Sequence, residues 1–149
     1  MIRQFLPQDA LPCCRLIHAC LEKDNSIPPS LRENIRSKET VQCMNERSKL
    51  FYVSVYESRN RILGIAGLDM NEIRLLYVSP KHQNHGTGRA LLEHLIPMVP
   101  AALFSDIFVY SSIQAVGFYK ACGFVEKGPF RFDLGVETLP VIFMTLPIT

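Results

Sequence analysis

The stretch that decides the fold is VSPKHQNHGTGRALLEHL, residues 78–95. It follows a strand-like run, IRLLYV, and joins a polar loop with two glycines to a segment with helical spacing. A glycine turn between a strand and a helix presents unpaired backbone N–H groups and the positive end of the helix dipole to an anion. The stretch predicts a site for a phosphorylated ligand; taken alone, the loop also fits an ordinary strand-to-helix turn.

Length and composition indicate a single domain over residues 1–149. Hydrophobic residues make up 48% and charged residues 20%, which is ordinary for a folded chain and too apolar for disorder. The formal net charge is +2 and the charges are scattered, so we expect no nucleic-acid or membrane-binding face. Without a signal peptide pattern or a run of about 18 apolar residues, the chain is expected to be cytoplasmic.

The cysteines and histidines argue against a metal centre. The five cysteines are odd in number, two are adjacent, and no CxxC or paired Cys/His spacing occurs. This argues against a structural zinc site and a disulfide scaffold, and fits a reducing cytosol. The four histidines form no ligand-like cluster. We therefore predict no metal site.

Hydrophobic periodicity predicts a mixed α/β sheet with helices on its faces, in the order β-α-α-β-β-β-α-β-α-β-β. Strands are expected near residues 2–5, 51–57, 62–70, 72–78, 106–111, 124–128 and 140–146. Helices are expected near residues 10–21, 30–43, 87–96 and 112–122. Short connections should make the strands between residues 51 and 78 an antiparallel meander.

Several residues mark the expected helix ends. Ser30 and Glu33 have the spacing of a capping box for the second helix. Pro97 should end the third helix, because proline lacks an N–H and crowds the preceding turn. Ser112 can cap the fourth helix and Gly123 can terminate it.

Two familiar phosphate-binding patterns are absent from the sequence. There is no GxxxxGK[ST], so a P-loop nucleotidase is not indicated, and no GxGxxG after the first strand, so a dinucleotide-binding Rossmann unit is not indicated either. A different pattern is present: V-x-P-x-x-Q-x-x-G-x-G at Val78, Pro80, Gln83, Gly86 and Gly88. It resembles the acyl-CoA-binding signature of the GNAT N-acetyltransferase superfamily.

A second signature strengthens the resemblance. A-x-x-F-Y-x-x-x-G-F at Ala115, Phe118, Tyr119, Gly123 and Phe124 is similar to the downstream motif of the same family. The two motifs occur in the family's order with a strand between them. The element order also fits from the first strand to the last, so the resemblance covers nearly the whole chain and implies a GNAT-like fold.

The resemblance implies where acetyl-CoA would bind. The fourth and fifth strands would splay apart, the pantetheine arm would pair with the backbone of the fourth strand, and the pyrophosphate would rest on the loop amides, with Arg89 as an ionic supplement. The implied cofactor-binding residues are Leu76, Tyr77, Val78, Gln83, Asn84, His85, Gly86, Thr87, Gly88, Arg89 and Ser112. Ser112 departs from the asparagine common in the family, so its contact could be replaced by a purely local capping role.

Catalytic roles follow by the same resemblance. Tyr119, with a reference pKa near ~10, would protonate the departing thiolate; the alternative is a packed aromatic residue. Glu72 would be the general base, often through water, unless it simply pairs with Arg74. Strand alternation is expected to place Glu72, Arg74, Leu76 and Val78 on one face. A backbone N–H of the fourth strand would hold the oxyanion.

The sequence thus predicts an enzyme that moves an acetyl group from acetyl-CoA directly to a primary amine. The alternatives are a non-catalytic acyl-CoA-binding module and a nucleotide-binding regulator. The acceptor, a small molecule or a peptide amine, is not identified by any motif, and a homodimer is compatible with the family. By position alone, Tyr52, Tyr56, Arg131 and Phe132 could face the acceptor.

Overall fold

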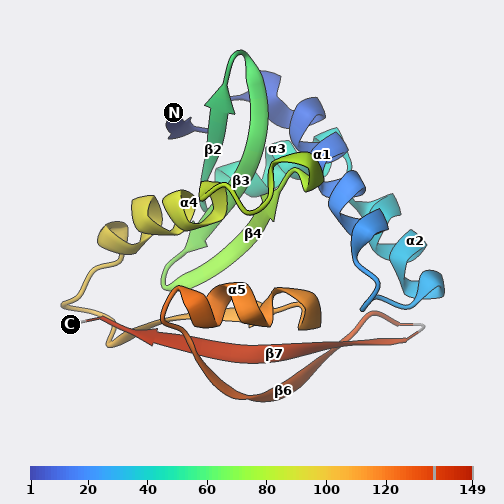
Figure 1. Ribbon diagram of the computed structural model, residues 1–149. Coiled ribbons are helices and arrows are strands. Elements are labelled where there is room, and N and C mark those ends of the chain that lie inside the picture. Colours follow the sequence, from blue (N-terminus) through green and yellow to red (C-terminus); the bar gives the residue numbers. More distant parts are fainter. Residues whose placement is uncertain (136, 149) are drawn as a thin grey trace.

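The computed structural model describes residues 1–135 and 137–148. At its centre is a seven-stranded sheet in the order β1-β2-β3-β4-β5-β7-β6 (Figure 1). Its strands are β1 (Ile2–Gln4), β2 (Tyr52–Ser58), β3 (Arg61–Asp69), β4 (Glu72–Val78), β5 (Asp106–Ser111), β6 (Val125–Asp133) and β7 (Thr138–Pro147). β4 and β5 run parallel, and the other neighbouring strands run antiparallel. The predicted mixed sheet and the meander of β2, β3 and β4 are confirmed.

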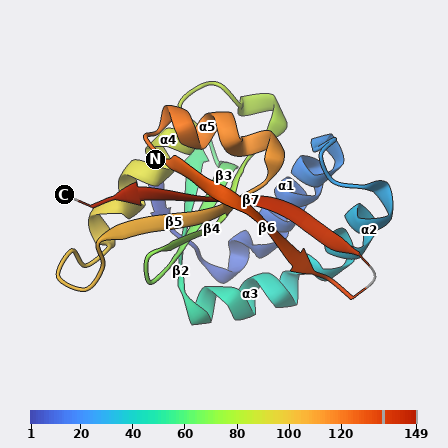
Figure 2. The same ribbon diagram turned by 90° about the horizontal axis from the view of Figure 1, so that it is seen from below.

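Helices cover both faces of the sheet (Figure 2). They are α1 (Ala10–Lys23), α2 (Pro29–Lys38), α3 (Val41–Leu50), α4 (Thr87–Leu95) and α5 (Val116–Ala121). One core lies between the sheet and the three N-terminal helices, and the other lies between the sheet and α4 with α5. Neighbouring residues of one strand serve opposite cores: Ile65 packs in the first and Ala66 in the second, as strand alternation requires.

The predicted helix over residues 30–43 is wrong in its extent, because the chain forms two helices there. Thr40 interrupts the segment: its Oγ1 accepts a hydrogen bond from the Cys43 N–H at 3.1 Å and so caps α3. Glu39, just before it, ion-pairs with Arg47 of α3. The observed order is therefore β-α-α-α-β-β-β-α-β-α-β-β.

The capping box predicted at Ser30 and Glu33 is also wrong. Proline at the first position of α2 starts this helix, without a side-chain cap. The Ser30 hydroxyl instead donates to Glu137 Oε2 at 2.7 Å, in the turn between β6 and β7. That turn is shorter than expected, since β6 continues to Asp133 and β7 begins at Thr138.

The predicted ends of α4 and α5 at Pro97 and Gly123 are confirmed. α4 stops at Leu95, immediately before a 3-10 turn that contains Pro97. Gly123 follows α5 with φ of +96°, a left-handed conformation that suits glycine at a helix end. Its N–H bonds the Lys120 carbonyl at 3.0 Å.

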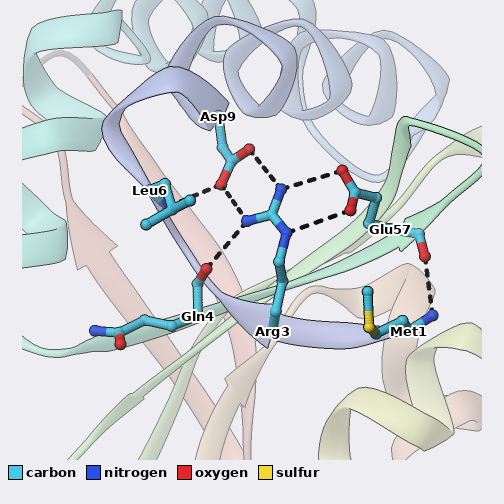
Figure 3. Close-up of polar contacts among 6 residues, drawn as sticks. All are labelled: Met1, Arg3, Gln4, Leu6, Asp9 and Glu57. Carbon is cyan, nitrogen blue, oxygen red and sulfur yellow. Dashed lines mark hydrogen bonds and ion pairs between the residues drawn. The ribbon is translucent and has the colours of Figure 1, made fainter.

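The N-terminal strand is fixed by a charged network around Arg3 (Figure 3). The Arg3 guanidinium donates to both carboxylate oxygens of Asp9 at 2.8 and 2.9 Å, and to Glu57 of β2 at 3.2 Å. Asp9 also accepts from the Leu6 N–H at 2.8 Å. Because Asp9 is buried, the network satisfies a carboxylate that would otherwise lose its hydration, and it ties β1 to the start of α1 and to β2.

Candidate active site

The parallel strands β4 and β5 separate along their length. Within the described residues they are in register at one position, where Glu72 faces Phe108. Beyond that pair a cavity of about 890 Å³ opens between them. Leu76, Tyr77 and Val78 line one side and Tyr110 with Ser112 the other. The splayed cleft implied by the family resemblance is therefore present.

A β-bulge in β4 sets which side chains enter this cleft. Gly67 of β3 faces Arg74, but Ile65 faces Tyr77, so one residue of β3 stands opposite two of β4. Leu75 lies at the bulge with φ of +57°, an uncommon conformation for a branched residue. The extra residue reverses the alternation of side chains along the strand.

The prediction that Glu72, Arg74, Leu76 and Val78 share one face is wrong for this reason. Arg74 lies over the Phe51 ring, 4.8 Å from its centroid, on the side of α1 and α3. Leu76 packs with the core of α4 and α5. Glu72 precedes Ile73, which also packs in the α4 core, so the Glu72 side chain lies on the same face as Arg74.

The glycine loop leads directly into α4. Asn84 and Gly86 both have positive φ, +63° and +84°, and Gly86 is the N-cap residue of α4. A Cβ on Gly88 would lie 3.0 Å from the Phe118 ring. Gly88 therefore lets α4 approach α5 closely, while the turn at Gly86 exposes the first amides of the helix.

Side chains hold this loop to the end of β4. The Val78 carbonyl accepts hydrogen bonds from Gln83 Nε2 at 3.1 Å and from Cys20 Sγ at 3.1 Å. Arg89 Nη2 donates to the Ala121 carbonyl at 2.8 Å, which joins α4 to the end of α5. Gln83 and Arg89 thus have structural contacts of their own, besides lining the cavity.

All but two of the predicted site residues line this single cavity: Leu76, Tyr77, Val78, Gln83, Asn84, Gly86, Thr87, Gly88, Arg89, Ser112 and Tyr119. Glu72 and His85 are not among the lining residues. Of the residues expected to face the acceptor, Phe132 lines the cavity, whereas Tyr52, Tyr56 and Arg131 do not.

Ser112 does not cap a helix with its side chain, contrary to the prediction. A 3-10 turn, Ile113–Ala115, separates it from α5. Its backbone carbonyl accepts from Ser111 Oγ at 2.7 Å and from the Ala115 N–H at 3.1 Å, while its side chain makes no capping bond. Ser112 still belongs to the cavity lining.

Tyr119 lies in the cavity wall with most of its ring buried. The ring packs edge-on against Phe118 and Phe124, with centroids 5.1 and 5.3 Å away. Burial raises the pKa of the Tyr119 hydroxyl above its ordinary value, with a smaller contribution from Tyr77. The hydroxyl is therefore protonated throughout the physiological range and chemically suited to donate a proton.

Glu72 lies where β4 and β5 are still paired. Burial raises the pKa of its carboxyl, and the nearby charge of Arg74 opposes this shift. Arg74 itself ion-pairs with Asp69 at 3.2 Å, so the alternative reading, in which it pairs with Glu72, is wrong. A carboxyl with a raised pKa is a better proton acceptor than an ordinary exposed one.

Part of the cavity lining comes from the region to which the family resemblance assigns acceptor specificity, namely the first two helices and the connection over residues 127–139. This part is formed by Cys20, Asp24 and Ile27 around the α1–α2 connection and by Leu139 and Val141 of β7. Only their position in the fold brings these segments together, and no motif marks them. Within residues 1–135 and 137–148, no group of three or more His, Cys, Asp or Glu side chains could hold a metal ion.

Comparisons with known proteins agree with this geometry. Residues 24–144 match the family described as the acetyltransferase (GNAT) domain. A segment of 82 residues is 34% identical to the peptidyl-lysine N-acetyltransferase YjaB of Escherichia coli K12, and covers 55% of this chain and 54% of that protein. The match thus spans about half the length of this curated relative.

Solved structures share the fold over almost the whole chain. A GCN5-related N-acetyltransferase from Rhodopseudomonas palustris superposes with a TM-score of 0.91 at 21% identity, covering 99% of this chain and 95% of its own. YncA from Salmonella typhimurium, solved with acetyl-CoA, gives a TM-score of 0.71 at 19% identity, covering 100% and 94%. With the family match over residues 24–144, the chain belongs to the GNAT acetyltransferase family.

Proposed function

We propose that the protein transfers the acetyl group of acetyl-CoA directly to a primary amine. The observation that carries this proposal is a single cavity that joins the glycine loop before α4, the splayed strand β4 and Tyr119. A long thioester with a phosphorylated end requires an anion site, a backbone that pairs with its arm and a proton donor in one cavity. The family membership supports the same reaction.

The residues present fit acetyl-CoA. The exposed amides between Asn84 and Arg89 at the start of α4 would hold the pyrophosphate. Backbone groups of Leu76, Tyr77 and Val78 would pair with the amides of the pantetheine arm, because the described residues of β5 do not pair with β4 at that level, whereas β3 pairs with its other edge. The Val78 carbonyl would then exchange at least one of its bonds from Gln83 and Cys20 for the arm.

The chemistry would be divided among a few groups. A backbone N–H of β4 near the bulge at Leu75 would stabilise the oxyanion that forms when the amine attacks the thioester carbonyl. Tyr119 would donate its proton to the departing thiolate. Glu72 would take the proton lost by the amine. The proton would pass through water, because the Glu72 side chain lies on the same face as Arg74 and outside the cavity lining.

The ε-amine of a lysine side chain is the first acceptor class to test. The support is the similarity to YjaB, a peptidyl-lysine N-acetyltransferase, over about half of each chain. Small-molecule amines belong in the same test, because the volume and the lining residues of the cavity admit either a lysine side chain or a small amine.

Calorimetric titration with acetyl-CoA, CoA and ATP tests the proposal. Micromolar binding of both CoA species, on the order of −8 kcal/mol, is expected, with none for ATP. An amine panel with free-thiol detection follows. Folded protein that binds no CoA would contradict the cofactor site. Tight CoA binding without acetylation of any lysine peptide or small amine would instead favour the non-catalytic module.

A further inference from the structure

The cofactor roles leave one part of the cavity lining unused, here called the acceptor end. It comprises Asp24 and Ile27, which belong to the α1–α2 connection, and Tyr110, Phe132 and Leu139 from β5, β6 and β7. A ligand that reaches the thioester from this side would contact these groups.

Asp24 offers a buried carboxylate at this end. The residue is only 9% exposed. Its Oδ1 accepts hydrogen bonds from the N–H and the hydroxyl of Ser26, whereas Oδ2 has no hydrogen bond or ion pair among the described residues. Arg32 donates to the Asp24 backbone carbonyl at 3.1 Å, not to the carboxylate. A carboxylate of this kind is available to a cation in the cavity.

The same cavity has an aromatic wall. Tyr110 and Phe132 line the cavity and meet edge-on, with ring centroids 5.1 Å apart. Both belong to a cluster of five aromatic rings on one face of β5, β6 and β7, with Phe108, Phe130 and Phe143. None of these five rings is part of either core. Exposed aromatic faces bind apolar groups and attract cations.

From this arrangement, and resting on the proposed function, we infer that Asp24 binds the acceptor amine in its ammonium form, before its proton passes through water to Glu72 and the neutral amine attacks, and that Tyr110 with Phe132 holds an apolar body attached to it. The acceptor class is a primary amine on an aliphatic or aromatic body. Polyhydroxylated amines, which would place hydroxyl groups against the aromatic wall, are poor acceptors.

Probe compounds separate the two contributions. Phenethylamine carries both groups, 2-phenylethanol lacks the ammonium and ethanolamine lacks the ring. Binding to the CoA-loaded protein is measured by NMR or calorimetry, and turnover by free-thiol release. Phenethylamine should bind at least about tenfold more tightly than either analogue. Equal binding of phenethylamine and 2-phenylethanol would overturn the role of Asp24.

Asp24→Asn is the decisive variant because asparagine Oδ1 can still accept both Ser26 bonds. It should raise the KM and the Kd for phenethylamine about 10- to 100-fold, with an unchanged Kd for acetyl-CoA. Glu22→Gln, on the exposed side of α1 and outside the cavity, should change none of these values. Asp24→Asn with an unchanged amine Kd contradicts the inference.

A matched pair of variants tests the aromatic wall. Phe132→Leu should reduce the preference for phenethylamine over ethanolamine about threefold to tenfold. Phe143→Leu, in the same cluster but outside the cavity lining, should leave it unchanged. Binding is measured without turnover, so a protein that binds amines but never acetylates them refutes the proposed function and not this inference.

Discussion

Glu72 of β4 lies directly opposite Phe108 of β5, and this is the only position at which these strands are in register among the described residues. The Phe108 N–H donates a hydrogen bond at 3.0 Å to the carbonyl of Asn71, the residue before Glu72. The pair closes the base of the split between the strands. It also brings the Glu72 side chain to the face that carries the aromatic cluster.

Replacing Glu72 with glutamine tests its proposed role as proton acceptor. Glu72→Gln should lower kcat about 10²-fold, the usual range for loss of a general base, with little change in the Kd for acetyl-CoA. Steady-state kinetics with saturating amine, together with calorimetry, measure both values. Asp69→Asn, which removes the nearby partner of Arg74, is the matched control and should retain activity.

The pH profile provides a second test of Glu72. A general base must be deprotonated, and burial raises the pKa of this carboxyl. The apparent pKa of the acidic limb in the profile of kcat against pH should therefore lie above the ordinary glutamate pKa near ~4.3. Activity should fall as the pH decreases through this apparent pKa. An unchanged acidic limb in Glu72→Gln would show that another group, or the free amine itself, sets the profile.

Tyr119→Phe tests the proton donor. The substitution keeps the ring contacts with Phe118 and Phe124 and removes only the hydroxyl, so stability should change little. kcat should fall about 10- to 100-fold, while the Kd for acetyl-CoA stays the same. Tyr56→Phe, a tyrosine of β2 outside the cavity lining, is the control. Full activity in Tyr119→Phe would reduce Tyr119 to a packing residue.

Much of this site could be predicted from sequence because its parts are local. The glycine loop, the start of α4 and the Phe118–Tyr119 pair each depend on short-range spacing, and the structure brings them to one cavity. The bulge at Leu75 was not predictable by alternation, since its signal is a backbone conformation and not a residue type. It reversed the faces inferred for Leu76 and Val78.

Apart from Phe132, the individual residues of the acceptor end could not be predicted, for a different reason. Asp24 lies in a polar break after α1, and only the fold brings it to one cavity with residues of β6 and β7 that follow more than a hundred positions later in the chain. The predicted helix boundaries were wrong where a side chain forms a hydrogen bond that the sequence pattern does not reveal. Ser30 bonds Glu137 in place of a cap, and Thr40 divides one predicted helix into α2 and α3.

Gly117 allows stability and cofactor binding to be separated. It lies inside α5 and lines the cavity, and a Cβ there would meet no atom within 4 Å. Gly117→Ala should stabilise the ligand-free protein by about 1 kcal/mol, or roughly 2–4 °C in Tm. If acetyl-CoA also occupies the cavity beside Gly117, the same change should weaken its binding several-fold.

Thermal unfolding and calorimetry check both effects of Gly117→Ala. The comparison variant is Gly88→Ala, whose Cβ would lie 3.0 Å from the Phe118 ring and should therefore destabilise the protein even without ligand. A more stable Gly117→Ala protein with unchanged acetyl-CoA affinity would place the cofactor elsewhere along the cavity.

The Arg3 network predicts a pH-dependent loss of stability. Arg3 lowers the pKa of the buried Asp9 carboxyl, chiefly through their hydrogen bonds. The stabilisation is therefore complete above the unfolded aspartate pKa near ~3.9, and it is lost as pH falls through the lower folded value. Arg3→Met should destabilise the protein by about 2–4 kcal/mol at pH 7, because Asp9 remains buried without its partner.

Urea unfolding at pH 7 and near pH 3 measures this linkage. In Arg3→Met the Asp9 carboxyl loses its cation but keeps its burial, so its pKa should rise and protonation should relieve the cost. The free-energy difference between the wild-type protein and Arg3→Met should then narrow as the pH is lowered. Arg61→Met, at the exposed start of β3, should show a small and pH-independent difference. A gap between wild type and Arg3→Met that stays constant with pH would mean that Asp9 is not the group that Arg3 stabilises.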